Sequence, residues 1–160
     1  MSAADLIAAA PKSVRECTKA SAPLFSLAGR RVAAKLYQVY DLDSFYAALE
    51  LDGRLCSFKC RLRHVDSPEL RAHDATEKKL AYEARDRARE LIDGRVCCLD
   101  CGEFDKYGRV LVEVTLADGT RLHEWALREH LALPYEGGTK CRDWAQLRAA
   151  RDALLRRRKM

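Results

Sequence analysis

Two short acidic stretches stand where the sequence changes from an extended pattern to a turn. YDLDSF contains Asp41 and Asp43, and HVDSPEL contains Asp66, Ser67 and Glu69 at a proline that must end a strand. Oxygen ligands of this kind, without a matching set of His or Cys, fit Ca²⁺ or Mg²⁺ better than zinc. The alternative is that each aspartate only caps a turn, which is the better interpretation of any one of them alone.

Two arginines and the loop DKYGR add groups that bind phosphate. Arg61 lies on the polar face of the stretch leading to Asp66, and Arg109 ends the loop 105–109. A divalent cation and two guanidinium groups neutralise charge on phosphoryl oxygens, while a further carboxylate activates or orients a water. This combination predicts hydrolysis of a phosphodiester. In a regular strand Arg61 and Asp66 face opposite sides, so the site requires a bend between them.

Alternating apolar and polar residues indicate the strands that would position these groups. Such patterns flank the Asp-Gly pair 52–53, and a second pair, 118–119, lies between RVLVEVTLA and TRL. An Asp-Gly pair between alternating segments is typical of a tight turn, so we expect two hairpins. VAAKLYQVY and RVCCLDCGEF supply two more strands. About five strands result, few enough to close into a barrel.

Helical periodicity begins after the third strand. We expect Asp74 to cap the first helix, Glu77 to be its capping-box partner and Gly94 to end it. Its apolar face would contain Leu80, Ala81, Ala84, Ala88, Leu91 and Ile92. A shorter helix is predicted over 123–129.

A basic helix is predicted over 141–158, with Trp144, Leu147 and Leu154 buried. The order of elements therefore predicts an α+β, mainly β, protein: a five-stranded barrel with about three helices packed on it. The segment 140–160 holds eight Lys or Arg against two Asp, in a chain of net charge +5. This cationic end could contact a polyanion or could be a solvated helix face, and charge alone does not decide between them.

Composition sets further bounds. The chain has 160 residues, 48% of them apolar and 33% charged, and no run approaches the roughly 18 apolar residues of a membrane span. We therefore expect no membrane partner. Residues 1–27 lack the pattern of a secretory signal and are expected to be a flexible or partly helical extension, with one domain over 28–160. We expect a monomer.

Seven cysteines, an odd number, suit a reducing compartment better than a disulfide framework, which favours an intracellular, cytoplasmic location. A zinc site built on Cys97, Cys98 and Cys101, together with Cys56 and Cys60, is an alternative. On a strand, however, Cys98 faces away from Cys97 and Cys101, so we favour buried free thiols.

The stretch from about Arg31 to Tyr135 resembles the thermonuclease, or staphylococcal nuclease-like, family, whose fold is an OB-fold barrel with appended helices. Three motifs carry the resemblance: YDLDSF in place of an Asp-Gly-Asp-Thr run, RLRHVDSPE in place of Arg, a short apolar stretch and Asp-(Thr/Ala)-Pro-Glu, and an unaltered DKYGR. Each is weak alone. Their order, with a hairpin and a helix correctly interposed, is specific.

The resemblance implies a calcium-dependent nuclease that cleaves DNA and RNA on the 5′-oxygen side of phosphorus and leaves 3′-phosphates. It implies that Asp43 and Asp66 bind Ca²⁺ through their side chains and Ser67 through its backbone carbonyl. Asp41 would lie just outside this ligand set.

The resemblance also assigns groups to the substrate. Glu69 would be the general base, and Arg61 and Arg109 would hold the scissile phosphate. The residues expected to contact a neighbouring phosphate are Lys106, Tyr107 and Tyr135.

The sequence departs from the family pattern at several positions. Leu42 replaces the usual glycine where a positive φ could be required, so the metal loop could be distorted. Arg63 and His64 stand at commonly apolar positions, and the loop 70–75 is short. The alternative function is a catalytically inactive nucleic-acid- or protein-binding OB module. Such members typically lack an acidic or arginine position, and this chain lacks none, which favours the enzyme.

Overall fold

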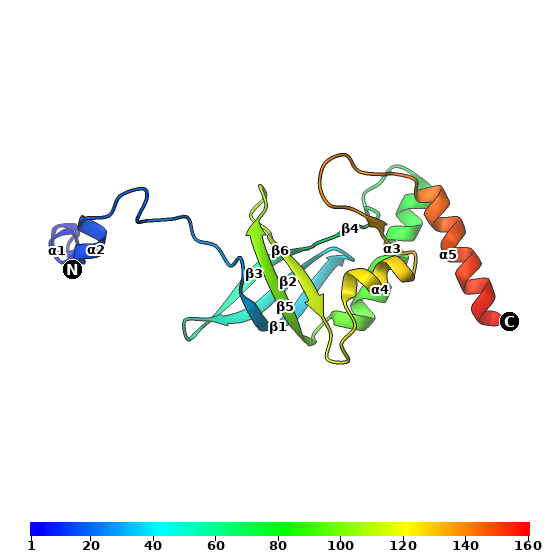
Figure 1. Ribbon diagram of the computed structural model, residues 1–160, viewed down its shortest axis with the longest axis horizontal. Coiled ribbons are helices and arrows are strands. Elements are labelled where there is room, and N and C mark those ends of the chain that lie inside the picture. The colour runs from blue at the N-terminus through cyan, green and yellow to red at the C-terminus, as the bar shows by residue number, and fades with distance from the viewer.

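Five strands close into a barrel in the order β1-β2-β3-β6-β5, in a computed structural model that describes residues 1–160. Helices α3, α4 and α5 gather at one side of this barrel (Figure 1). Barrel and helices share one core, which includes Leu36 of the barrel, Leu80, Trp125 and Trp144. The predicted α+β OB-fold barrel is confirmed. Its strands are β1 (Arg31–Asp41), β2 (Ser44–Leu51), β3 (Arg54–Leu62), β5 (Val96–Phe104) and β6 (Val110–Thr115).

The two Asp-Gly pairs have different outcomes. Asp52 and Gly53 both take positive φ, 50° and 78°, and join β2 to β3 in the predicted hairpin. Of the second predicted hairpin, only the turn and one antiparallel bridge form, without a second strand. After the turn at 118–119 the chain makes a single bridge between Thr115 and Arg121, and helix α4 (Leu122–Arg128) begins at once. The TRL segment is too short to extend a ladder before helical periodicity takes over.

The bend that the site requires lies directly after β3. His64 has a φ of 70°, a left-handed conformation that turns the chain into the two-residue strand β4 (Val65–Asp66). β4 pairs with β7 (Leu133–Pro134), and this small second sheet was not expected from the sequence. The turn brings Arg61 and Asp66 to the same side of the barrel.

Helix α3 (Ala75–Ile92) begins at Asp74, whose side chain accepts from the Glu77 amide at 2.7 Å, and it is followed by Gly94 with a φ of 73°. The cap and the stop are therefore as expected. The capping box is not formed, because the Glu77 carboxylate turns away from the cap and accepts from the backbone amide of Glu69. Leu91 is half-buried rather than fully buried.

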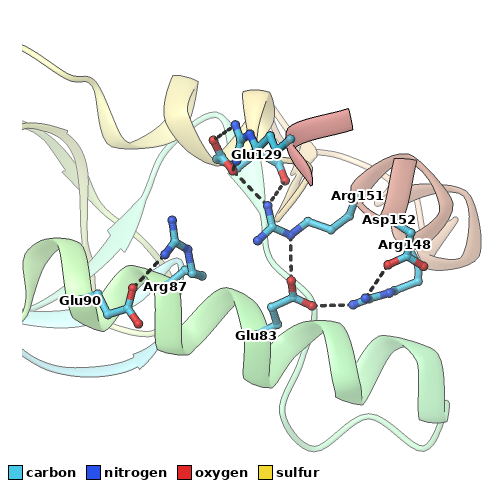
Figure 2. A network of polar contacts seen from close by, with 8 residues as sticks. Glu83, Arg87, Glu90, Glu129, Arg148, Arg151 and Asp152 are labelled. Carbon is cyan, nitrogen blue, oxygen red and sulfur yellow. Dashed lines mark hydrogen bonds and ion pairs between the residues drawn. The ribbon is translucent and has the colours of Figure 1, made fainter. Parts of the chain in front are cut away.

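Helix α5 (Trp144–Lys159) is attached to α3 and α4 by a network of ion pairs, shown in Figure 2. Arg151 is 3% exposed and binds Glu83 of α3 at 2.9 Å and Glu129, which follows α4, at 3.0 Å. Arg148 also binds Glu83, and Arg158 binds Glu129. Leu154, expected in the core, is half-buried. The cationic end was expected either to contact a polyanion or to be a solvated helix face. Neither interpretation describes Arg148, Arg151 and Arg158, whose ion pairs attach α5 to the rest of the protein.

The first residues lie away from the barrel (Figure 1), in two short helices with no buried residue, α1 (Ala3–Ala8) and α2 (Lys12–Arg15). The segment joins the fold at Phe25, which packs against Phe104, and at the buried Leu27. None of the helices combines the length and apolar composition that crossing a membrane demands.

Candidate active site

Two adjoining clefts contain all ten residues singled out in the sequence. The first, of about 610 Å³, is lined by Asp41, Asp43, Arg61, Asp66, Ser67, Glu69, Tyr107 and Arg109. The second, of about 500 Å³, is lined by Lys106 and Tyr135. Arg61, Tyr107, Arg109 and Lys140 border both clefts, so the two spaces meet at these side chains.

Arg61 joins the two aspartates expected to bind calcium. Its Nη1 lies 2.9 Å from Asp43 Oδ2, and its Nη2 lies 3.3 Å from Asp66 Oδ1. Nη1 also donates to the carbonyls of Leu62 and Val65 on the two sides of the bend. All three charged side chains are buried, so the guanidinium both fixes the bend and offsets the repulsion between the carboxylates.

Lys140 reaches one of these carboxylates from the loop before α5. Its Nζ lies 2.7 Å from Asp66 Oδ1 and 5.6 Å from the ring centre of Tyr135. Nothing in the sequence indicates this contact, because Lys140 looks like the first residue of the cationic end. A divalent cation that used this oxygen of Asp66 would have to displace the ammonium group.

Two oxygens in the first cleft are buried without a hydrogen-bond partner: Oδ1 of Asp41 and Oγ of Ser67. Burial, and then the negative charge of Asp43, raise the pKa of Asp41 to about 8. The Ser67 amide donates to Asp43 Oδ2 at 2.9 Å, which holds the two expected ligands together. Hard oxygen atoms with free lone pairs fit Ca²⁺. Leu42, between the aspartates, has no positive φ and is fully buried, so the loop accepts it as a core residue.

Glu69 projects from the turn after β4 and is exposed in the first cleft. Its carboxylate makes no hydrogen bond or ion pair, whereas its backbone amide donates to Oε1 of the buried Glu77 at 3.1 Å. Helix α3 therefore fixes the backbone that carries Glu69 and leaves the carboxylate free to act on water. The sequence pattern predicts Glu77 only as part of the helix cap. The short loop before α3 is the sequence feature that could have indicated that the Glu77 side chain reaches the backbone of Glu69 instead.

The loop DKYGR is a tight turn organised by Asp105. The Asp105 carboxylate accepts from the amides of Tyr107 and Arg109 and from Nε of Arg109, all within 2.9 Å. Gly108 has a φ of 78°, which a residue with a side chain rarely adopts. Because Asp105 uses only Nε of Arg109, both Nη groups remain free to donate into the clefts.

The family model for staphylococcal nuclease homologues matches residues 59–159, well over half of the chain. The protein belongs to the staphylococcal nuclease family. The match takes in Arg61, Asp66, Glu69 and Arg109, while the aspartate pair of the β1–β2 turn precedes it. No curated protein matches the chain.

In this nuclease-family domain the segment carrying Tyr135 is tied to the bend after β3. The Tyr135 amide donates to the carbonyl of His64, and the ring nitrogens of His64 lie 2.7 Å from Glu136 and 2.7 Å from Glu113. The hydrogen bond with Glu113, supported by Glu136, raises the pKa of His64. His64 therefore links β6, the bend and the Tyr135 segment around the second cleft.

The cysteines of the domain are all free thiols, and Cys60, Cys97 and Cys101 are buried. Burial raises the pKa of the Cys60 thiol to about 12. Cys98 is less buried than its neighbour Cys97, as a strand requires. No group of three or more His, Cys, Asp or Glu side chains is arranged to hold a metal ion. The expected calcium ligands do not require a group of three such side chains, because they are two carboxylates and a backbone carbonyl.

Proposed function

We propose that the protein is a calcium-dependent nuclease that hydrolyses phosphodiesters of DNA, RNA or both and leaves 3′-phosphate products. The observation that carries this proposal is the first cleft, where an unpaired carboxylate faces the same space as two buried aspartates and two arginines. The single chain supplies every one of these groups, so we propose that it acts as a monomer.

Calcium would be held by the side chains of Asp43 and Asp66 and by the carbonyl of Ser67, with Asp41 beside them. Bound there, Ca²⁺ supplies positive charge that stabilises the phosphoryl oxygens. Neither the unpartnered Oδ1 of Asp41 nor the unpartnered Oγ of Ser67 is one of these ligands, but both support a cation nearby, because they are buried oxygen lone pairs without a donor.

The protein's own groups perform the proton transfer. Glu69 accepts a proton from a water, whose oxygen forms a bond to phosphorus as the bond from phosphorus to the 5′-oxygen breaks. The electron pair of the broken bond stays on the 5′-oxygen, which then takes up a proton from solvent water. Arg109, with both Nη groups free, would hold the phosphoryl oxygens together with Arg61, which is buried among the carboxylates but lines the same cleft.

The second cleft would hold the next phosphate of the chain. Lys106 makes no ion pair and lies 5.1 Å from the ring centre of Tyr107, so its ammonium group is available to a phosphate oxygen. The hydroxyl of Tyr135 donates to the Gly138 carbonyl at 3.2 Å and borders the same space. These contacts would position the nucleic acid without reading its sequence.

A second candidate is a nucleic-acid-binding module without catalysis. One observation favours it: Arg61 and Lys140 already supply positive charge to Asp43 and Asp66. If these cations were permanent partners of the carboxylates, calcium would not enter and the clefts would only bind nucleic acid.

Cleavage of end-labelled single-stranded DNA and of a matching RNA distinguishes the two functions. The strands are incubated with the protein in Ca²⁺, Mg²⁺ or EDTA, and the ends of the products are identified. We expect cutting in Ca²⁺, none in EDTA, and 3′-phosphate ends. Binding of either strand without cutting in any metal would establish the module instead.

A further inference from the structure

The first cleft extends beyond the residues of the proposed reaction, along the outer face of three barrel strands. Its wall there consists of Gln38 and Tyr40 of β1, Tyr46 of β2 and Lys59 of β3, which we call the tyrosine wall. The proposed hydrolysis gives none of these four residues a role, although they share one space with Glu69 and Asp66.

A bulge in β1 aims Tyr40 into this cleft. The register of β1 with β2 shifts between Tyr37 and Asp41, and Gln38 has a φ of 47°. The extra residue changes which side chains point inward, so Val39 is buried at 1% exposure and Tyr40 is 49% exposed. Without it, strict alternation from the buried Leu36 would place Tyr40 inside the barrel. A non-glycine residue at positive φ is unfavourable, and such positions concentrate at functional sites.

The remainder of the wall is aromatic and cationic. Tyr46 stacks on Tyr37 with ring centres 5.6 Å apart, and Lys59 Nζ lies 5.9 Å from the Tyr46 ring centre. Cross-strand pairs of this kind also stabilise sheets, so Tyr37 and Tyr46 do not by themselves indicate a ligand. Tyr40 is different, because its ring has no aromatic partner and its hydroxyl no hydrogen bond. Lys59 makes no ion pair, and neither does Arg71, which lines the same cleft.

We propose that the tyrosine wall binds one unpaired nucleotide of the substrate, next to the scissile phosphate and on the other side of it from the second cleft. This inference rests on the proposed function. The two clefts meet at Arg61 and Arg109, so a strand that passes from Lys106 across Arg109 arrives at the tyrosine wall. The base stacks on the ring of Tyr40, and Lys59 binds a phosphate oxygen. Stacking requires a base free of its complement, which makes single strands the preferred substrate.

Binding of a fluorescent ten-nucleotide thymidine strand, measured by anisotropy in Ca²⁺, tests the proposal. Glu69→Gln is introduced into every protein compared, so that the strand stays intact. We expect Tyr40→Ala to weaken binding roughly tenfold, Tyr40→Phe to retain it because the ring is kept, and Lys59→Met to lower the salt slope by about 0.7. Matched controls are Tyr82→Ala and Lys78→Met on α3, outside both clefts, which should leave binding unchanged.

The probe set separates stacking from general loss of affinity. Tyr40→Ala should have little effect on an abasic ten-unit strand and on a duplex of the same length, because neither offers a free base. The proposal would be overturned if Tyr40→Ala weakened binding of the abasic strand as much as binding of the thymidine strand. It would also be overturned if Tyr40→Ala weakened binding no more than Tyr82→Ala does. If the protein that retains Glu69 cuts no substrate but Tyr40→Ala still weakens binding, base binding at the tyrosine wall is supported and the nuclease function is contradicted. If the protein cuts the substrate but Tyr40→Ala has no effect on binding, the nuclease function is supported and base binding at the tyrosine wall is contradicted.

Discussion

Among single residues, Lys140 has the most direct influence on the proposed calcium site. Its ammonium group lies 2.7 Å from Asp66 Oδ1 in a loop that contains Gly137 and Gly138, both at positive φ. The flexible side chain and the glycine-containing loop allow Lys140 to leave when a divalent cation binds. Until then the ammonium group offsets the charge of a carboxylate that is only 5% exposed.

Replacement of Lys140 should strengthen calcium binding. In Lys140→Met the ion no longer has to displace an ammonium group, and one repulsive charge beside it is gone, so we expect the dissociation constant for Ca²⁺ to fall by about tenfold. Isothermal titration calorimetry without nucleic acid measures this, with Lys159→Met, at the far end of α5, as the control. An unchanged or weaker affinity in Lys140→Met would show that the Lys140 contact does not oppose calcium.

Glu77 acts through the backbone of Glu69. Glu77→Ala removes the acceptor for the Glu69 amide and loosens the turn, so we expect kcat to fall about tenfold or more with KM little changed. Steady-state cleavage of a labelled oligonucleotide measures both constants, and Lys78→Ala on the exposed face of α3 is the control. A variant with a lower melting temperature but an unaltered kcat would mean that Glu77 only supports the fold.

The candidate site could be predicted from the sequence where residue type alone decides the chemistry. The carboxylates, the arginines and DKYGR were found in this way, and the structure gathers them in two clefts. Glu77 and Lys140 were missed because their partners depend on where a short loop and a glycine-containing segment place them. The sequence left open whether Leu42 distorts the loop between the two aspartates, and in the structure its side chain is fully buried in the core.

Among the elements, α5 packs through buried charge as well as through apolar residues. Trp144 and Leu147 are buried at its start, and beyond them Arg151 occupies the contact with α3 and α4. Hydrogen bonds from Arg158 and Arg151 lower the pKa of Glu129 to about 2. Sequence periodicity located this helix but not its partners, because Glu83 and Glu129 are distant in the chain and look like ordinary surface residues.

The ion pairs of Glu129 should make the stability of the folded protein depend on pH. Glu129 has a lower pKa in the folded protein than its ordinary value of 4.5, so its contribution is complete above that value and is lost as the pH falls toward 2. We expect Glu129→Gln to lower the free energy of unfolding by roughly 1.5–3 kcal/mol at neutral pH.

Urea unfolding between about pH 2 and pH 7 measures this difference. The difference in the free energy of unfolding between the unaltered protein and Glu129→Gln should decrease steadily as the pH falls below the ordinary pKa of a glutamate. Glu90→Gln, at an exposed ion pair with Arg87, serves as the control and should differ little at any pH. A gap that stays constant with pH would contradict the role assigned to the Glu129 charge.

For the whole molecule, the alternating pattern and the Asp-Gly turn at 52–53 predicted the barrel, because a half-buried sheet imposes a period of two on its sequence, whereas the Asp-Gly pair at 118–119 makes a turn without a second ladder. The strands β4 and β7 have only two residues each, which is too short to show this alternation, so the small sheet that they form could not be predicted from the sequence. The bend at His64 was required by the spacing of Arg61 and Asp66, yet its left-handed backbone became visible only in the structure. The strand ends and turns that carry the candidate residues thus line two adjoining clefts.

We propose that Glu69, in a calcium-loaded cleft, activates the water that attacks phosphorus. The most direct test of this proposal compares the unaltered protein with Glu69→Gln, prepared identically, for turnover and for binding of the same labelled single-stranded DNA in Ca²⁺. We predict that turnover falls by about 10²- to 10⁴-fold while the dissociation constant stays within about twofold. Equal turnover of the two proteins, or loss of binding in step with turnover, would contradict the assignment of Glu69 as the general base.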